Sequence, residues 1–306
     1  MHAFFRSPAA AYVLLPISAA SWAGNHVLAR AVAGEAPPAS LCAVRWLMLS
    51  LLLGVVCRDT IRQDIPKLKA GLGSILFLGL IGAAGFGTLQ YVALQYTTAL
   101  NMGVVGSIAP AFIVTASYLI FGDRMGPRQL LGVLISLLGV LAIVCRLHPE
   151  LLASLSFNLG DVLVIVNMLM WAIYSACLRL RPQVQPMSFI FAISVVGFLA
   201  NLPLAAGEYA YGYHLQPTVL TIGTILYAGF VTTLLAYLTW NKGIELVGAP
   251  RASAFLHTIP LFSALFATTF LGERIELYHV VGFALIIGGV TLAARAEKAP
   301  PAKVRT

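Results

Sequence analysis

Residues 104–143 read VVGSIAPAFIVTASYLIFGDRMGPRQLLGVLISLLGVLAI, and residues 254–293 read AFLHTIPLFSALFATTFLGERIELYHVVGFALIIGGVTLA. The second stretch repeats the pattern of the first at a shift of 150 positions, without a gap. Because 150 is about half of 306, the repeat predicts two related halves, residues 1–150 and 151–306. The matched residues are Pro110 with Pro260, Gly122 with Gly272, Asp123 with Glu273, Arg124 with Arg274, Gly132 with Gly282 and Gly139 with Gly289.

The composition indicates an integral membrane protein. Hydrophobic residues make up 59% of the chain, charged residues only 10%, and the mean hydropathy is +0.90. A soluble domain holds roughly one-quarter charged residues, whereas this chain repeats apolar runs of the ~20 residues that cross a hydrocarbon core of ~30 Å. In lipid the backbone must satisfy its own hydrogen bonds, and continuous rather than alternating apolar runs indicate helices and not barrel strands. We therefore expect an all-α integral membrane fold.

Turn signals divide the apolar runs into ten predicted transmembrane helices, five in each half. Prolines and glycines mark most of the boundaries, for example Pro37 with Pro38, Pro66, and Gly126 with Pro127. The ten predicted spans cover residues 9–31, 39–57, 71–95, 99–121, 128–146, 159–178, 186–206, 217–240, 249–271 and 277–294.

Lysine and arginine predict the orientation of these spans. With the amino terminus in the cytoplasm, the cytoplasmic segments hold 15 of the 19 Lys and Arg residues, whereas the opposite side holds Arg30, Arg146 and Arg274. This positive-inside pattern places both termini in the cytoplasm. Since each half has an odd number of spans, the second half is predicted to be inverted relative to the first. The formal charge of +8 follows from this topology, so we expect a lipid bilayer and no nucleic acid as a partner.

Two spans carry matching polar and aromatic faces near mid-membrane. Residues spaced three and four apart share one face of a helix, and a shift of 149 positions places Trp22 on Trp171. Polar side chains that face lipid are costly, so we expect both faces to line a shared cavity. For each single residue the alternative is a hydrogen bond to a neighbouring helix. The faces consist of Ser18, Trp22, Asn25 and His26 in the first half and of Asn167, Trp171, Tyr174 and Ser175 in the second.

The repeated prolines add a second set of candidate positions. Ser107 and His257 occupy the same place in the two halves, three residues before Pro110 and Pro260. A proline in a helix frees a carbonyl and permits a bend, and broken helices at matching places mark the binding sites of transporters. We expect Ser107 and His257 to bind substrate and the two prolines to act as gating hinges, the alternative being a packing kink without ligand contact. Weaker additions nearer a membrane face are Gln90, Tyr91, Tyr237 and Asn241.

A pattern of proline, glycine, acid, arginine and glycine occurs once in each half. Together with Trp22, Arg45 and Trp171, it makes the chain resemble a known family over almost its whole length. That family is the EamA-type, ten-helix branch of the drug/metabolite transporter superfamily. The resemblance implies a bacterial inner-membrane exporter of small metabolites, often amino acids, that works by alternating access between inverted halves. Within that branch the chain is similar to bacterial aromatic-amino-acid exporters. Within the matched motif one departure is visible, a conservative one: the first copy has Asp123 where the second has Glu273.

The predicted spans carry few charged residues at bilayer depth, and this narrows the expected class of substrate. A phosphorylated solute would need a paired cation at bilayer depth, yet Arg45 lies roughly 9 Å from the outer end of its span and can snorkel to the interface. No acid lies in the first span, which disfavours proton coupling through a buried carboxylate, while His26 and His257 leave coupling open because histidine titrates near neutral pH.

We therefore expect a neutral or zwitterionic solute with apolar bulk, such as an amino acid, aromatic ones included. Aromatic side chains can stack on a ring or an aliphatic chain, and amide, hydroxyl and imidazole groups can bind an ammonium and a carboxylate. The aromatic candidates are Trp22, Trp171, Tyr174 and Tyr91, and the polar ones are Asn25, His26, Asn167, Ser107 and His257.

No motif in the sequence predicts an enzyme, a cofactor or a metal. There is no GxxxxGK nucleotide loop, no HExxH pair and no metal-ligand spacing among the four cysteines. Two rival classes stay open. The first is a membrane-embedded enzyme on lipid-linked substrates, which would need His, Asp or Glu clustered at one face, whereas the histidines here are scattered. The second is a channel, a membrane regulatory protein or an assembly partner; a channel would show unsaturable flux, and a regulator none. Within the exporter class, other small metabolites or drugs are the alternative cargo. The sequence leaves open the exact substrate, the coupling and the oligomeric state, a monomer being one option.

Overall fold

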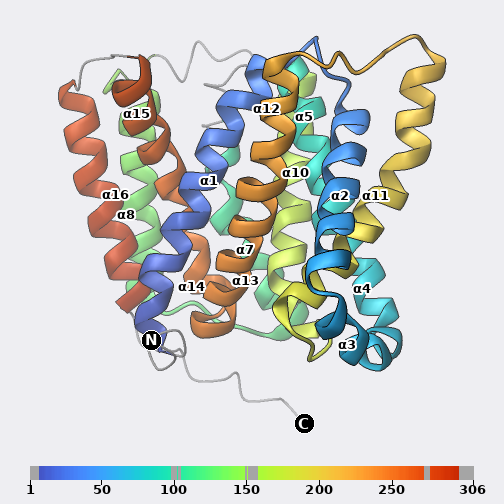
Figure 1. Ribbon diagram of the computed structural model, residues 1–306. Coiled ribbons are helices and arrows are strands. Elements are labelled where there is room, and N and C mark those ends of the chain that lie inside the picture. The colour runs from blue at the N-terminus through green and yellow to red at the C-terminus, as the bar shows by residue number, and fades with distance from the viewer. Residues whose placement is uncertain are drawn as a thin grey trace.

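The computed structural model of the protein describes residues 7–97, 102, 105–148, 150, 158–271 and 276–295. Within these ranges the chain is helical and contains no strand, which confirms the all-α expectation. The second copy of the repeated turn, Gly272 with Glu273 and Arg274, lies outside the described residues. The helices stand side by side in one bundle, and α1 begins at the same end of the bundle at which α16 ends (Figure 1). We call this the terminal end, and the other the distal end.

The first half contains a short 3-10 turn, η2 (Pro8–Ala10), followed by α1 (Ala11–Ala31), α2 (Pro38–Val56) and α3 (Arg58–Ala70). A long span follows, made of α4 (Leu72–Leu78), the π-helix η3 (Gly79–Gly85) and α5 (Phe86–Tyr96). The described part of this half closes with α7 (Ala109–Phe121) and α8 (Pro127–Val144).

The second half repeats this order. It contains α10 (Leu159–Cys177) with the 3-10 turn η4 (Leu178–Leu180), then α11 (Pro186–Ala210). The next span again has a π-helix in its middle: α12 (Val219–Tyr227), η5 (Ala228–Leu235) and α13 (Ala236–Val247). Last come the broken span α14 (Ala249–Ser253), η6 (Ala254–His257) and α15 (Thr258–Leu271), and then α16 (Leu277–Arg295).

Within the described part of the chain, seven helical segments are long and apolar enough to cross a membrane. Three predicted spans fall outside this set: α1, whose apolar run is interrupted by Asn25 and His26; α7, with 13 residues; and the pieces α14, η6 and α15. The count of ten crossings therefore stays a prediction. The seven segments are Pro38–Val56, Leu72–Tyr96, Pro127–Val144, Leu159–Leu180, Pro186–Ala210, Val219–Val247 and Leu277–Ala294.

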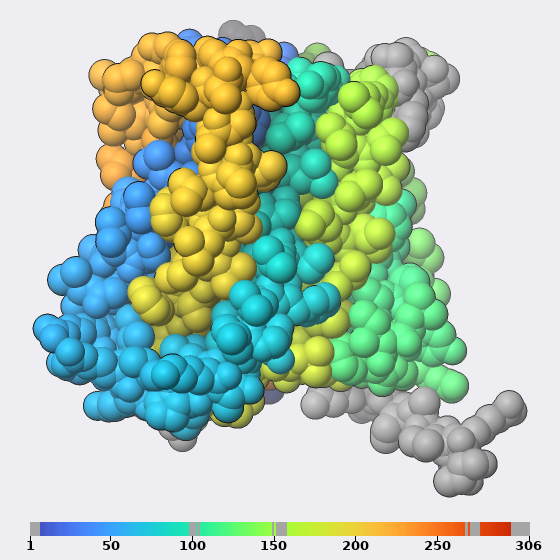
Figure 2. All heavy atoms as spheres, turned by 90° about the vertical axis from the view of Figure 1, so that its right-hand side faces the viewer, coloured from blue at the N-terminus to red at the C-terminus, as the bar shows by residue number. Residues whose placement is uncertain are grey.

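The outer faces of the helices are apolar. Figure 2 shows α11 crossing one side of the bundle beside α2, with α3 below them. On these helices Leu51 and Val55 of α2 are 61% and 77% exposed, and Leu199 and Leu204 of α11 are each 57% exposed. Such side chains are stable against acyl chains and unstable in water, as expected for a bundle held in lipid.

Residues 58–70 differ from the sequence prediction, because the expected turn at Pro66 is wrong. This segment forms helix α3 at the terminal end, with Pro66 inside it (Figure 1). Asp59 in its first turn and Lys67 and Lys69 in its last complement the helix dipole. Its buried Asp64 accepts a hydrogen bond from the backbone N–H of Gln185, 2.9 Å away, and so holds the start of α11.

The two repeated prolines stand at breaks in their spans and not in the middle of continuous helices. Pro110 lies in the first turn of α7, and Ser107 and Ile108 form a turn just before it. Pro260 is the third residue of α15, directly after the 3-10 turn η6. A proline in the first turn of a helix removes no hydrogen bond, so the break precedes each proline instead of arising at it.

Helices α8 and α16, which are repeat counterparts, pack against each other in opposite directions. Gly132 touches Gly289, whereas Gly139 touches Gly282. A Cβ atom added at Gly289 would lie only 2.4 Å from the backbone nitrogen of Ser136 and 2.5 Å from the carbonyl oxygen of Gly132. Glycine lets the two backbones approach this closely. Because Gly132 is the counterpart of Gly282, each contact joins one glycine to the counterpart of the other; the inverted arrangement of the two halves stays a prediction.

Candidate functional site

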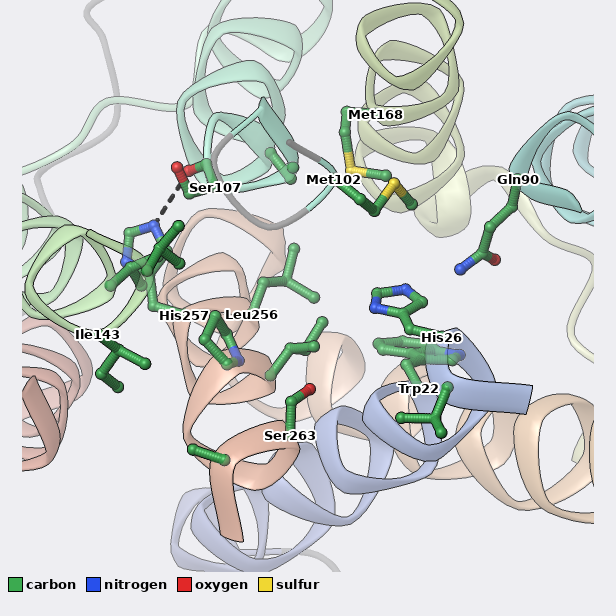
Figure 3. Close-up of a pocket in the computed structure, with 18 of the residues that line it drawn as sticks. Trp22, His26, Gln90, Met102, Ser107, Ile143, Met168, Leu256, His257 and Ser263 are labelled. Atoms are coloured by element: carbon green, nitrogen blue, oxygen red, sulfur yellow. Dashed lines mark hydrogen bonds between the residues drawn. The ribbon is translucent and has the colours of Figure 1, made fainter. Parts of the chain in front are cut away.

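A cavity of about 500 Å³ opens inside the bundle, between the two halves. It extends from Trp22 and Trp171, midway along α1 and α10, to Arg30 and Arg146 at the distal end. Figure 3 shows the residues reaching into it from α1, α5, α10 and the η6–α15 break. Since both arginines are exposed, the cavity communicates with the distal surface.

An aromatic cluster forms the floor of the cavity. Trp22 meets Trp171 edge to face with ring centroids 5.0 Å apart, and it meets Trp240 in the same way at 5.4 Å. Phe86 packs on Trp171 at 4.4 Å, and Tyr174 stacks on Trp171 at 5.2 Å. Trp171 and Trp240 are 2% and 0% exposed, so the cluster leaves no open path toward the terminal end. Its members are Trp22, Phe86, Trp171, Tyr174, Tyr237 and Trp240.

On the terminal side of this floor, polar contacts between the halves also close the bundle. The hydroxyls of Ser18 and Thr239 hydrogen-bond at 2.6 Å and join α1 of the first half to α13 of the second. At the terminal surface Arg179 of η4 forms an ion pair with Asp123, in the turn after α7. The terminal end is therefore closed by contacts that cross from one half to the other.

Further charges at the terminal surface hold the second half together. Arg181, just after η4, forms an ion pair with Glu245 of α13 at 2.7 Å. Lys242 of the same helix also pairs with Glu245. These contacts fix the end of α10 against α13, so the segment that carries Arg179 keeps its place opposite Asp123.

Two polar side chains enter the cavity without a hydrogen-bond partner among the described residues. His26 of α1 and Gln90 of α5 both line it and reach into it from neighbouring helices (Figure 3). Their repeat counterparts are Ser175 and Trp240, which hydrogen-bond to each other at 3.2 Å in the closed end. The same two repeat positions thus hold a hydrogen-bonded pair at the terminal end and, at the distal end, two polar groups without a partner among the described residues.

His257 ties the two broken spans together at one side of the cavity. Its Nε2 lies 3.1 Å from the backbone oxygen of Ser107, its own repeat counterpart (Figure 3), and its Nδ1 lies 2.6 Å from Ser136 Oγ on α8. A carbonyl oxygen can only accept, so Nε2 carries a proton and donates. His257 is 1% exposed, and its position is therefore fixed on both ring nitrogens.

A tyrosine–asparagine hydrogen bond recurs in both halves behind the cavity wall. Tyr91 Oη donates to Asn25 Oδ1 at 2.8 Å, between α5 and α1. Tyr174 Oη donates to Asn241 Oδ1 at 3.0 Å, between α10 and α13. The repeat register aligns Asn25 with Tyr174 and Tyr91 with Asn241, so the two halves make the same bond with the residue types exchanged. Each pair fixes the first span of its half to the third.

The structure brings part of the predicted site together. Trp22, His26, Ser107, Trp171, His257 and Pro260 line the cavity. Gln90, one of the weaker candidates, lines it as well. The other five main candidates do not line it: Asn25 and Tyr91 bond to each other, Tyr174 packs in the aromatic floor, Asn167 is fully buried on α10, and Pro110 lies in the first turn of α7. Consecutive side chains on an α-helix point about 100° apart, which separates Asn25 from His26 and Asn167 from Met168.

Arg45 does not snorkel to the interface, and that expectation is wrong. Its side chain is 3% exposed and lies among aromatic rings, with the guanidinium carbon 5.0 Å from the ring centre of Trp46 and 5.7 Å from that of Tyr91. A Cβ atom at Gly87 would come within 2.5 Å of its Nη2. The cation is therefore held between α2 and α5 by aromatic faces, which stabilise a buried charge.

Several residues that line the cavity have no counterpart among the predicted site residues. Phe86, Met102 and Met168 contribute apolar surface, and Arg30 and Arg146 form the rim. The sequence marked the two arginines only as charges on the outer side. The signal that could have identified them as rim residues is their position at the ends of predicted spans 1 and 5. No acidic residue occurs among the described residues that line this cavity, and none of the described residues forms a cluster able to hold a metal ion.

Known proteins are similar to this chain in sequence, and one solved structure is similar in fold. A model of the EamA-like transporter family matches residues 9–145 and 158–295, one match in each half. The uncharacterized transporter YyaM of Bacillus subtilis is 27% identical over 282 residues, which cover 89% of this chain and 90% of YyaM. A Salmonella typhimurium protein named a probable amino-acid metabolite efflux pump is 23% identical and covers 88% of this chain and 89% of its own. A protein of known crystal structure, 20% identical, matches 92% of this chain and 96% of its own with a TM-score of 0.69; it shares the fold.

Proposed function

Because this chain belongs to the EamA-like transporter family, we propose that it is a bacterial inner-membrane transporter that exports small amphipathic metabolites, amino acids with aromatic or aliphatic side chains first among them. One observation carries the proposal. A cavity of about 500 Å³ reaches the distal surface, while an aromatic floor, a hydroxyl pair and an ion pair between the halves close the terminal end.

This arrangement is the shape expected of one state of an alternating-access carrier. With both termini in the cytoplasm, the open distal end faces outward, and the closed terminal end faces the cytoplasm. Repeat counterparts that differ in their contacts support exchange between two states. At the open end His26 and Gln90 have no hydrogen-bond partner among the described residues, whereas Ser175 and Trp240 bond to each other at the closed end. The opposite state would form if the halves rocked and the two ends exchanged these arrangements.

The cavity lining supports the substrate class. Trp22, Phe86 and Trp171 offer ring faces and edges for an apolar side chain, and the flexible side chains of Met102 and Met168 adapt to its shape. His26 and Gln90 add donors and acceptors for the polar end. A cavity of this volume lies within the usual range for small-molecule sites, ~300–1,000 Å³. The relative named a probable amino-acid metabolite efflux pump supports the same class.

Counterflow in proteoliposomes tests the proposal. Vesicles loaded with an unlabelled amino acid should concentrate the same labelled amino acid from outside, and the rate should saturate with concentration. Replacing Trp22, Trp171 or His257 singly by Ala should lower the rate at least about tenfold, because each loses a contact that shapes the cavity. Tyr118→Ala, an exposed position on α7, is the matched control and should leave the rate unchanged.

A channel is the second candidate, and the same assay separates it. A channel would carry labelled solute at a rate that grows with concentration without saturating, and unlabelled solute inside would not accelerate uptake. The closed floor favours a carrier, because a conducting pore needs one continuous path. Wild-type counterflow that no tested amino acid supports, or single variants that all retain normal rates at normal expression, would overturn the proposed function.

A further inference from the structure

The rim of the cavity is cationic. Arg30, at the end of α1, and Arg146, just after α8, reach the opening from separate helices, and both are exposed. The lining described by the structure holds no Asp or Glu that would neutralise them. A cleft with low-dielectric walls and charges of one sign focuses its field and raises the local concentration of ions of the opposite sign.

The position of each arginine is fixed by contacts that, among the described residues, include no acidic partner. Arg30 donates from Nη1 to the backbone oxygen of Leu94, 3.1 Å away on α5. Arg146 lies with its guanidinium carbon 5.9 Å from the ring centre of Tyr278 on α16. Its backbone is left-handed, with φ of 52°, and that of Leu147 is also left-handed, at 62°. Such conformations are costly for residues with a Cβ and persist where their surroundings enforce them.

The repeat counterpart of Arg30 has an acidic partner, which Arg30 lacks among the described residues. The shift of 149 positions that places Trp22 on Trp171 also places Arg30 on Arg179. At the closed end Arg179 forms an ion pair with Asp123 through both of its terminal nitrogens. At the open end Arg30 has only a carbonyl oxygen as partner among the described residues. The same position is thus neutralised by an acid at one end and is available to an anion at the other.

We propose that Arg30 and Arg146 bind the carboxylate of the transported molecule while its apolar side chain lies on the aromatic floor. Eight residues separate Trp22 from Arg30, roughly 12 Å along α1, and a ligand of amino-acid size together with the long arginine side chain fills that distance. The carboxylate is then the recognised group and the amine is not. This inference rests on the proposed function and narrows its substrates to carboxylic acids with an aromatic or aliphatic tail.

Three probes that differ only in their charged groups test the inference. They are L-phenylalanine, L-phenylalaninamide, which lacks the carboxylate, and N-acetyl-L-phenylalanine, which lacks the ammonium. Binding to the purified full-length protein is measured by tryptophan fluorescence, and the effect of each unlabelled probe on phenylalanine counterflow is measured in proteoliposomes. The acid and its N-acetyl form should bind within about threefold of each other, and the amide at least about tenfold more weakly.

Substitutions assign the effect to the rim. Arg30→Gln and Arg146→Gln should each raise the Kd of phenylalanine about fivefold to tenfold and leave that of the amide unchanged. Arg30→Lys should restore much of the affinity, because it keeps the charge. Arg62→Gln, at an exposed position of α3 at the terminal end, is the matched control.

Equal binding of phenylalanine and its amide by the wild type would overturn this inference and leave the proposed function standing. The inference also fails if Arg30→Gln weakens the binding of acid and amide to the same degree, since that is the signature of a structural role. Failure of all three probes to bind, together with absent counterflow for every amino acid tried, would instead overturn the proposed function itself.

Discussion

At the residue scale, single hydrogen bonds hold the helices that surround the cavity. Tyr91 and Asn25 share one such bond, and Tyr174 and Asn241 share its counterpart in the second half. All four side chains are at most 4% exposed. In a buried apolar setting, a polar atom that loses its hydrogen-bond partner cannot bond to water instead. Removing a tyrosine hydroxyl therefore costs more stability than the net contribution of one hydrogen bond.

Removing either hydroxyl should lower the stability of the protein. Tyr91→Phe leaves Asn25 Oδ1 without its donor, and Asn25 Nδ2 already lacks a partner within the described chain. The expected cost is about 0.6–1.5 kcal/mol, and Tyr174→Phe should cost about the same. Melting in detergent, followed by tryptophan fluorescence, measures it. Tyr12→Phe, at 37% exposure, is the control; a Tm no lower for Tyr91→Phe than for Tyr12→Phe would contradict the prediction.

At the element scale, close packing of α8 on α16 depends on glycine at the crossing. Gly289→Ala would place a methyl group against backbone atoms of Ser136 and Gly132, which cannot move aside as a side chain can. We expect a loss of about 1–3 kcal/mol in the free energy of unfolding. Gly288→Ala is the matched control on the same helix, because a Cβ there meets no atom within 4 Å. Equal melting temperatures for the two variants would refute the packing described for this helix pair.

At this scale the sequence predicted the helices, the repeat and a break near each repeated proline, but not the two π-helices or helix α3. Runs of apolar residues predicted most helix boundaries to within a few residues, because lipid demands them. The π-helices at Gly79–Gly85 and Ala228–Leu235 escaped prediction, since a shift from i+4 to i+5 hydrogen bonds leaves little trace in the hydrophobic pattern. The helix α3 escaped it because Pro66 is a turn signal in most contexts.

The sequence predicted cavity-lining residues only where a helix face points into the bundle. Helical spacing found Trp22, His26 and Trp171, which line the cavity, but it could not tell them from Asn25 or Asn167, about one turn or less away. The rotation of a helix about its axis is set by neighbours distant in sequence. For the same reason Arg45 was misplaced, because Tyr91 of α5 comes to lie beside it only in the fold.

At the scale of the whole molecule, transport by alternating access requires two ends that are not open together. The distal end is open in this structure, and the terminal end is held by contacts between the halves, Asp123 with Arg179 and Ser18 with Thr239 among them. Exposed ion pairs each contribute only about 0–1 kcal/mol. The ion pair between Asp123 and Arg179 is therefore a weak contact, and on the proposed mechanism it breaks when the substrate favours the other state.

Locking the terminal end tests this claim most directly. In a variant whose four native cysteines are replaced, Asp123→Cys and Arg179→Cys are joined by a reversible, bifunctional thiol reagent of matching length. The joined protein should bind phenylalanine with unchanged Kd through the open distal end but lose counterflow, and cleavage of the bridge by a reducing agent should restore transport. Counterflow that continues at the unlinked rate while the bridge is intact would contradict alternating access.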